Sequence, residues 1–217
     1  MKKHRQAWIA AGIAALCMTA FCMPVSAEGK VVTAMTSDKL TPELADPTQS
    51  SADFRLYEMI YDPLVRYGEN GELIPALAES WDVSEDGTVY TFHLRKDVKF
   101  SDGTDFNADN VLWNYERWQE MEVLGNFSSE LLSVEKEDDY TVKFTFGGNA
   151  YTVLIELSYP RPFRFTCESA LDEDGNFVKE VGTGMWMIDS YVTNEEVVFV
   201  PNPNYYGEKP QIDEVVL

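Results

Sequence analysis

Two segments in which apolar and polar side chains alternate constrain the fold most strongly. In "TVYTFHL" the apolar residues Tyr90, Phe92 and Leu94 point to one side of an extended chain, and the polar residues between them point to the other. This pattern predicts a half-buried antiparallel strand that follows a tight turn at "SEDG". Alternation returns in "DDYTVKFTF", where the apolar positions are Val142, Phe144 and Phe146. We therefore expect a second strand there.

Helices and further strands are indicated elsewhere. Asn107 is a predicted N-cap for the helix "ADNVLWNYERWQEM", in which Val111, Leu112, Tyr115 and Trp118 recur at helical spacing. A loop over residues 40–51 and a short helix over 52–61 should precede Pro63, which ends that helix. A buried strand is expected at 30–35, another strand at 197–202, and an apolar strand in the final "IDEVVL".

The first 27 residues read as a secretory signal peptide. Basic residues near the N-terminus precede an apolar run from Ala7 to Met23, and small residues end the segment at Ala27. The run is short for a spanning helix. We therefore expect an exported chain that begins near Glu28 and is periplasmic or extracellular.

The charge of the exported chain excludes some partners. Without the signal peptide it carries 14 basic and 37 acidic side chains, a formal charge of −23. Such a surface repels nucleic acid and anionic lipid, so no nucleic-acid partner is expected. Cys167 is the only cysteine left, which rules out a disulfide framework and a cysteine-rich metal site.

Catalytic chemistry is hard to build from this chain. His93 is the only histidine after the signal peptide, and the alternation places it in a strand with no nucleophile motif nearby. Several histidine or cysteine ligands are usual in zinc or nickel sites, so a bound metal would need most of its ligands from another molecule. "GTG" at 182–184 lacks the Lys-Ser/Thr of a phosphate loop. An exported hydrolase and an adhesive or chaperone-like protein remain as alternatives to a binding protein.

Arg161 is the best candidate for ligand chemistry. It lies between Pro160 and Pro162 in "YPRPFRF", and both prolines restrict the backbone around it. A guanidinium held on so stiff a backbone loses little freedom when it binds a carboxylate through two nitrogens. A stacked surface arginine in a rigid turn is the alternative. We expect Arg164 to pair with a neighbouring acid.

Three stretches together resemble the family 5 extracellular solute-binding proteins of ABC importers. They are "MIYDPLVRYGENGELIPALAESWDVSEDGTVYTFHLRKDVKFSDGTDFNADNVLWNYE", "GTGMWMI" and "NPNYYGEKPQIDEVVL". The resemblance implies an α/β fold, the periplasmic binding protein type II of cluster C. Lobe one would be discontinuous, from residues 28–54 and 182–217, with an extra α+β subdomain at 55–181. Family members are roughly twice as long, so we expect the second lobe to be absent from this chain.

The resemblance also implies a ligand and a partner. "YPRPFRF" is more similar to the nickel and metallophore binders than to the peptide binders. In the nickel proteins the arginine between the prolines helps to hold the carboxylates of a chelator around the metal, and here that residue is Arg161. The remaining pocket residues would be Asp53 and Phe54, where a methionine is expected, and Leu124 and Phe127, where an arginine and a tryptophan are expected. The implied protein is not an enzyme and has no cofactor; it presents a nickel chelate, or alternatively a short peptide, to a membrane permease.

Overall fold

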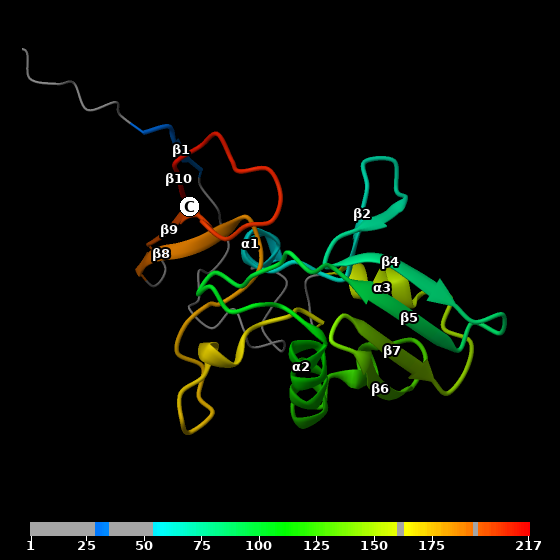
Figure 1. Cartoon of the computed structure of the whole chain (residues 1–217). Helices are drawn as coiled ribbons and strands as arrows, with labels where there is room; N and C mark the ends of the chain where they lie inside the picture. Colours follow the sequence, from blue (N-terminus) through cyan, green and yellow to red (C-terminus); the bar gives the residue numbers. More distant parts are fainter. Residues whose placement is uncertain (1–28, 35–53, 160–162, 193–194) are drawn as a thin grey trace, which may run out of the picture.

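The computed structural model describes residues 29–34, 54–159, 163–192 and 195–217 (Figure 1). The predicted signal peptide, the predicted loop at 40–51, Asp53 and Arg161 lie outside the described residues. The part that is described combines three helices with two four-stranded sheets and a small two-stranded sheet. Mixed helices and strands agree with the predicted α/β class.

The first four-stranded sheet contains the alternating segments. Its order is β4 (Ala78–Val83), β5 (Val89–Leu94), β7 (Thr141–Phe146) and β6 (Leu131–Asp138), and all neighbours are antiparallel. The alternation is confirmed, because the predicted apolar positions of β5 and β7 are buried and the residues between them are partly exposed. Phe92 and Phe144 meet edge to face, with ring centroids 5.3 Å apart. These rings belong to a core shared with α2 (Ala108–Glu120) and α3 (Val153–Ser158).

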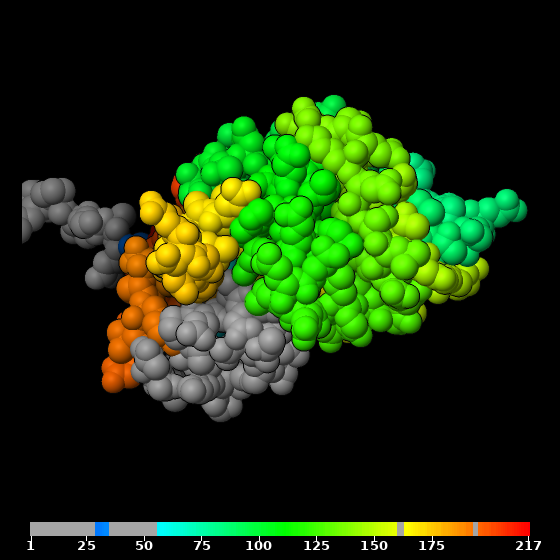
Figure 2. All heavy atoms as spheres, turned by 90° about the horizontal axis from the view of Figure 1, so that it is seen from below, coloured from blue at the N-terminus to red at the C-terminus, as the bar shows by residue number. Residues whose placement is uncertain are grey.

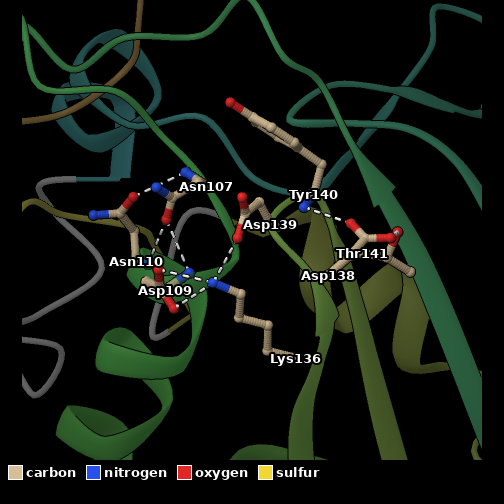
Figure 3. A network of polar contacts seen from close by, with 8 residues as sticks. All are labelled: Asn107, Asp109, Asn110, Lys136, Asp138, Asp139, Tyr140 and Thr141. Atoms are coloured by element: carbon tan, nitrogen blue, oxygen red, sulfur yellow. Dashed lines mark hydrogen bonds and ion pairs between the residues drawn. The ribbon is translucent and has the colours of Figure 1, made fainter.

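Helix α2 begins where the sequence predicts. The Asn107 side chain accepts hydrogen bonds from the backbone of Asp109 and Asn110, and the Asn110 side chain accepts from the backbone N–H of Asn107. Lys136 on β6 binds Asp109 at 2.9 Å and Asp139 at 2.9 Å (Figure 3). This network ties the start of the helix to the sheet, although its ion pairs are exposed and contribute little each.

The second four-stranded sheet joins segments from both ends of the described chain. Its order is β1 (Val31–Thr33), β10 (Glu214–Val216), β9 (Glu196–Pro201) and β8 (Trp186–Val192), with β1 parallel to β10. The strands predicted at 30–35, at 197–202 and in the final segment are therefore present. The expected burial of the first strand is wrong, because β1 is an edge strand of the described sheet and all three of its residues are exposed.

Helix α1 (Phe54–Ile60) packs against the second sheet and ends before Pro63, as predicted. Its buried residues form a second core with β9, made of Leu56, Tyr57, Ile60, Tyr61, Val197 and Phe199. The hairpin of β2 (Val65–Tyr67) and β3 (Leu73–Pro75) follows, and α3 contacts β2. The two four-stranded sheets lie at opposite ends of the described molecule (Figures 1 and 2). Short 3-10 turns, η2 (Leu124–Asn126) and η3 (Glu168–Ala170), complete the connections.

The "GTG" segment joins α1 to the second sheet. The backbone N–H of Gly184 donates to the carbonyl of Ile60 at 2.8 Å, at the C-terminal end of α1. A Cβ on Gly184 would lie 2.6 Å from the carbonyl oxygen of Met59, and a Cβ on Gly182 would lie even closer to that of Ile60. The glycines are therefore needed for backbone contact with a helix end, and this explains "GTG" without a nucleotide.

Within the described residues, no helix is both long enough and apolar enough to cross a membrane.

Candidate functional site

A cavity of 520 Å³ opens between α1, the β2–β3 hairpin, the end of α3 and the start of β8. Its volume is within the usual range for small-molecule sites. Segments that are far apart in the sequence supply its wall, so the cavity exists only when the chain is folded. The lining residues are Glu58, Met59, Tyr61, Pro63, Arg66, Tyr67, Ser158, Tyr159, Met185, Trp186 and Tyr205.

Backbone contacts hold these segments together. The docking of "GTG" on α1 places Met185 and Trp186 directly after it, beside Met59 in the cavity wall. The buried Asn202 side chain donates to the Gly184 carbonyl at 2.9 Å, and its backbone N–H donates to the Met185 carbonyl at 2.8 Å. These bonds fix the start of β8 against the chain that leads to Tyr205.

The wall is rich in aromatic rings and thioethers. Five of the eleven lining residues are aromatic and two are methionines. Two of the rings are unusually open, because Tyr67 is 44% exposed and Tyr159 is 47% exposed. Such a wall offers flat polarisable contacts to an organic solute, together with the hydroxyl and indole N–H groups of its tyrosines and tryptophan.

The described wall contains two charged residues, Arg66 and Glu58. Arg66 forms an ion pair with Asp62, whose carboxylate is fully buried. Glu58, one helical turn before Asp62, also lines the cavity. Burial raises the pKa of the Glu58 carboxyl above its usual range, and the nearby Arg66 guanidinium offsets part of that rise.

The described part of "YPRPFRF" runs from the cavity into the core. Tyr159 lines the cavity, whereas Phe163 and Phe165 are buried and meet the ring of Trp118 on α2. The following residue, Thr166, exchanges backbone hydrogen bonds with the buried side chain of Asn114, at 2.9 and 3.1 Å. The chain is therefore anchored in the core from Phe163 onward, and residues 160–162, which include Arg161, are outside the described residues.

The other predicted site residues are distributed differently. Phe54 is the first residue of α1, and its side chain, like Asp53, is outside what the structure describes. Phe127 is 7% exposed and stacks on Phe163, with ring centroids 3.8 Å apart. Leu124 packs at the edge of the same core. Neither Leu124 nor Phe127 is among the residues that line the 520 Å³ cavity.

Among the described residues Arg164 forms no ion pair with an acid, contrary to the expectation. It is 4% exposed, and its guanidinium lies over the ring of Tyr57 at 4.2 Å and that of Tyr61 at 5.5 Å. Among the described residues its two terminal nitrogens have no hydrogen-bond partner. The alternation of the segment explains this position, because Phe163 and Phe165 enter one core and turn Arg164 toward α1.

We predict that the charge of Arg164 adds little to stability. A buried guanidinium loses its hydration, and the attraction of two tyrosine rings offsets about 2 kcal/mol of that cost. Arg164→Met keeps an unbranched stem and should change the free energy of unfolding by less than about 1 kcal/mol. Arg164→Ala leaves a cavity and should lower it by about 2 kcal/mol. Urea denaturation of both variants measures the difference, and equal losses would show that the charge itself stabilises the fold.

The cavity residues that sequence reasoning missed had weak signals. Met185 and Trp186 lie in "GTGMWMI" and Tyr205 in "NPNYYGEKP", segments used above only to recognise a family. Met59 and Arg66 flank Pro63, which was read only as a helix end. No local pattern distinguishes such residues from core residues, because the contacts that create the cavity are long-range.

A second cavity, of 600 Å³, includes Asp102, Glu180 and Asp189 in its wall. The Tyr61 hydroxyl donates a hydrogen bond to Glu180, so this contact connects the walls of the two cavities.

No group of three or more His, Cys, Asp or Glu residues in the described ranges could hold a metal ion. His93 lies 2.9 Å from Asp82 on the neighbouring strand, at the surface.

Comparisons with known proteins identify similar chains. Residues 72–217 match the model of the family described as bacterial extracellular solute-binding proteins, family 5 Middle. The nickel-binding periplasmic protein of Escherichia coli is 36% identical over 214 residues, covering 93% of this chain and 39% of the relative. Di/tripeptide-binding protein 4 of Pseudomonas aeruginosa is 34% identical, covering 67% and 32% respectively.

A solved structure agrees with the sequence matches. NikA from Brucella suis in complex with Fe(III)-EDTA superposes with a TM-score of 0.76 at 34% identity. The superposition covers 86% of this chain and 39% of that chain. The chain thus spans about two fifths of the length of these relatives.

Proposed function

The chain belongs to family 5 of the bacterial extracellular solute-binding proteins, and we propose that it captures a chelate of nickel or another metal for delivery to the permease of an ABC importer. Membership in this family agrees with the expectation that the chain is not an enzyme. The proposal places the protein in the periplasm or outside the cell, where the predicted signal peptide would direct it. Residues 28–54 and 182–217 would form lobe one, and residues 55–181 its extra subdomain.

The observation that carries the proposal is the setting of Arg161. The described residues offer no cluster of protein ligands for a metal, so a metal would have to arrive already held by a small molecule. Carboxylates are typical metal ligands in such molecules, and an arginine can grip them through two parallel hydrogen bonds. Arg161 follows Tyr159 of the cavity wall by two residues, and prolines on both sides restrict its backbone.

The cavity supplies the rest of the contact. Its aromatic and thioether wall can cover the organic part of a chelate and exclude water from it. In this arrangement Arg161 recognises the charge of the chelator, and the wall recognises its shape. We propose that Asp53 and Phe54 act on the solute from the start of α1, and that Leu124 and Phe127 act indirectly, through the core in which Phe127 stacks on Phe163.

A short peptide is the second candidate solute. Di/tripeptide-binding protein 4 is 34% identical to this chain, close to the 36% of the nickel-binding relative. A peptide carboxylate could also bind Arg161, and an aromatic wall tolerates many side chains. The two candidates differ in their need for a metal.

Titration calorimetry on the purified chain distinguishes them. We expect binding of Ni²⁺ in the presence of excess histidine, and binding of Ni²⁺ alone weaker by at least about 10-fold, because the protein supplies few ligands. A mixture of di- and tripeptides without metal is the third arm. Tight single-site binding of Ni²⁺ alone would contradict the chelate proposal, and binding confined to the peptides would establish the second candidate.

A further inference from the structure

We propose that the 520 Å³ cavity recognises an organic ammonium group, held by the open aromatic rings and the Glu58 carboxylate. The inference rests on the proposed function only in treating this cavity as a solute site. It adds a chemical class to the solute: one that carries a positive group as well as the carboxylates that Arg161 would hold.

The rings are the first argument. Tyr67, Tyr159, Trp186 and Tyr205 line the cavity and are at least partly exposed; Tyr61 also lines it, but it is 1% exposed and its ring already lies beside the Arg164 guanidinium. An ammonium group is attracted to the negative face of such rings, and sites built from several rings are a recurrent way of holding quaternary ammonium ligands. Tyr67 is 44% exposed, which leaves part of its side chain open to a solute.

The balance of charge is the second argument. Among the described lining residues Arg66 is the only basic one, and its guanidinium is already paired with Asp62. One oxygen of that buried carboxylate, Oδ2, has no hydrogen-bond partner among the described residues. Glu58 then adds a second negative charge without a second positive one. The described part of the wall therefore carries a net negative charge, which favours a cation.

The thioethers are compatible with the same solute. Met59 and Met185 are polarisable and can contact the methyl or methylene groups next to a charged nitrogen. Among the described lining residues Glu58 is the only carboxylate, whereas a compact divalent cation usually takes several oxygen ligands. An organic cation, which is weakly hydrated and apolar on its outside, matches the cavity better than a bare metal ion.

Choline and 3,3-dimethyl-1-butanol form a matched pair of probes, because the alcohol replaces the charged nitrogen by carbon at nearly constant shape. Calorimetry or ligand-observed NMR should show choline binding to the chain, with the alcohol at least about 5-fold weaker. Glu58→Gln and Tyr67→Leu should each raise the Kd of choline by about 5-fold. Glu173→Gln and Tyr151→Leu change exposed residues outside the cavity and should leave the Kd unchanged.

The choline experiment tests the ammonium site independently of the nickel titration. Equal affinity for choline and the alcohol would show an apolar cavity and overturn the inference. Absence of choline binding up to about 20 mM, or binding that none of the cavity variants changes, would overturn it as well. Choline binding that persists while Ni²⁺ with histidine fails to bind would contradict the proposed solute and leave the ammonium site standing.

Discussion

Gly182→Ala is expected to lower the free energy of unfolding by about 3 kcal/mol, the largest loss of stability that we predict for a single methyl group. The added Cβ would overlap the carbonyl oxygen of Ile60 and lie 2.8 Å from Cδ1 of Tyr61. Neither neighbour can move easily, because the first is backbone and Tyr61 is 1% exposed. The helix end and "GTG" would have to separate, and the hydrogen bond from Gly184 to Ile60 would weaken.

Gly125→Ala is the matched control for this substitution. Nothing lies within 4 Å of a Cβ at Gly125, so its free energy of unfolding should change by less than about 0.5 kcal/mol. Urea denaturation of both variants gives the comparison. Similar values for the two would show that α1 and "GTG" do not touch as closely as described. Because Met185 and Trp186 follow "GTG", Gly182→Ala should also weaken solute binding at the cavity.

The sequence predicted the helices and strands whose signals lie within a few neighbouring residues. The Asn107 cap of α2 and the alternation in β5 and β7 were visible because the relevant residues lie within a few positions of one another. Strand β6 was not predicted, since all four residues in the second half of "LLSVEKED" are charged and the segment has no clear alternation. β1 was predicted to be buried from its valines, but burial depends on how many strands lie beside it.

The candidate site was less predictable for the same reason. Its wall extends from Glu58 to Tyr205, and the contact that organises it joins Ile60 to Gly184. Arg164 was also placed wrongly by local reasoning. An arginine in a proline-rich turn is usually exposed, but this one is buried against two aromatic rings. What the sequence did indicate was the stiff setting of Arg161, which follows from proline geometry alone.

Arg161→Ala is expected to weaken binding of Ni²⁺ with histidine by about 1.5 to 3 kcal/mol, roughly 10- to 150-fold in Kd, because a charge-assisted hydrogen bond to the chelator is lost. The fold should be unaffected, since Phe163 and Phe165 anchor the segment in the core independently of Arg161. Arg161→Lys should recover only part of the affinity, because an ammonium cannot form the two parallel bonds of a guanidinium.

Calorimetry on the unmodified chain and the two Arg161 variants measures these differences, and urea denaturation verifies that each chain is folded. Arg95→Ala is the control for the loss of one positive charge, because that guanidinium is bound to Asp97 and lies over Tyr206, and Arg95 does not line the cavity. Electrostatic attraction at a distance would make the two alanine variants equal and would weaken with added salt. A direct grip on the chelator predicts a large loss for Arg161→Ala alone, and that loss should persist at high salt because the bonded pair excludes water and ions.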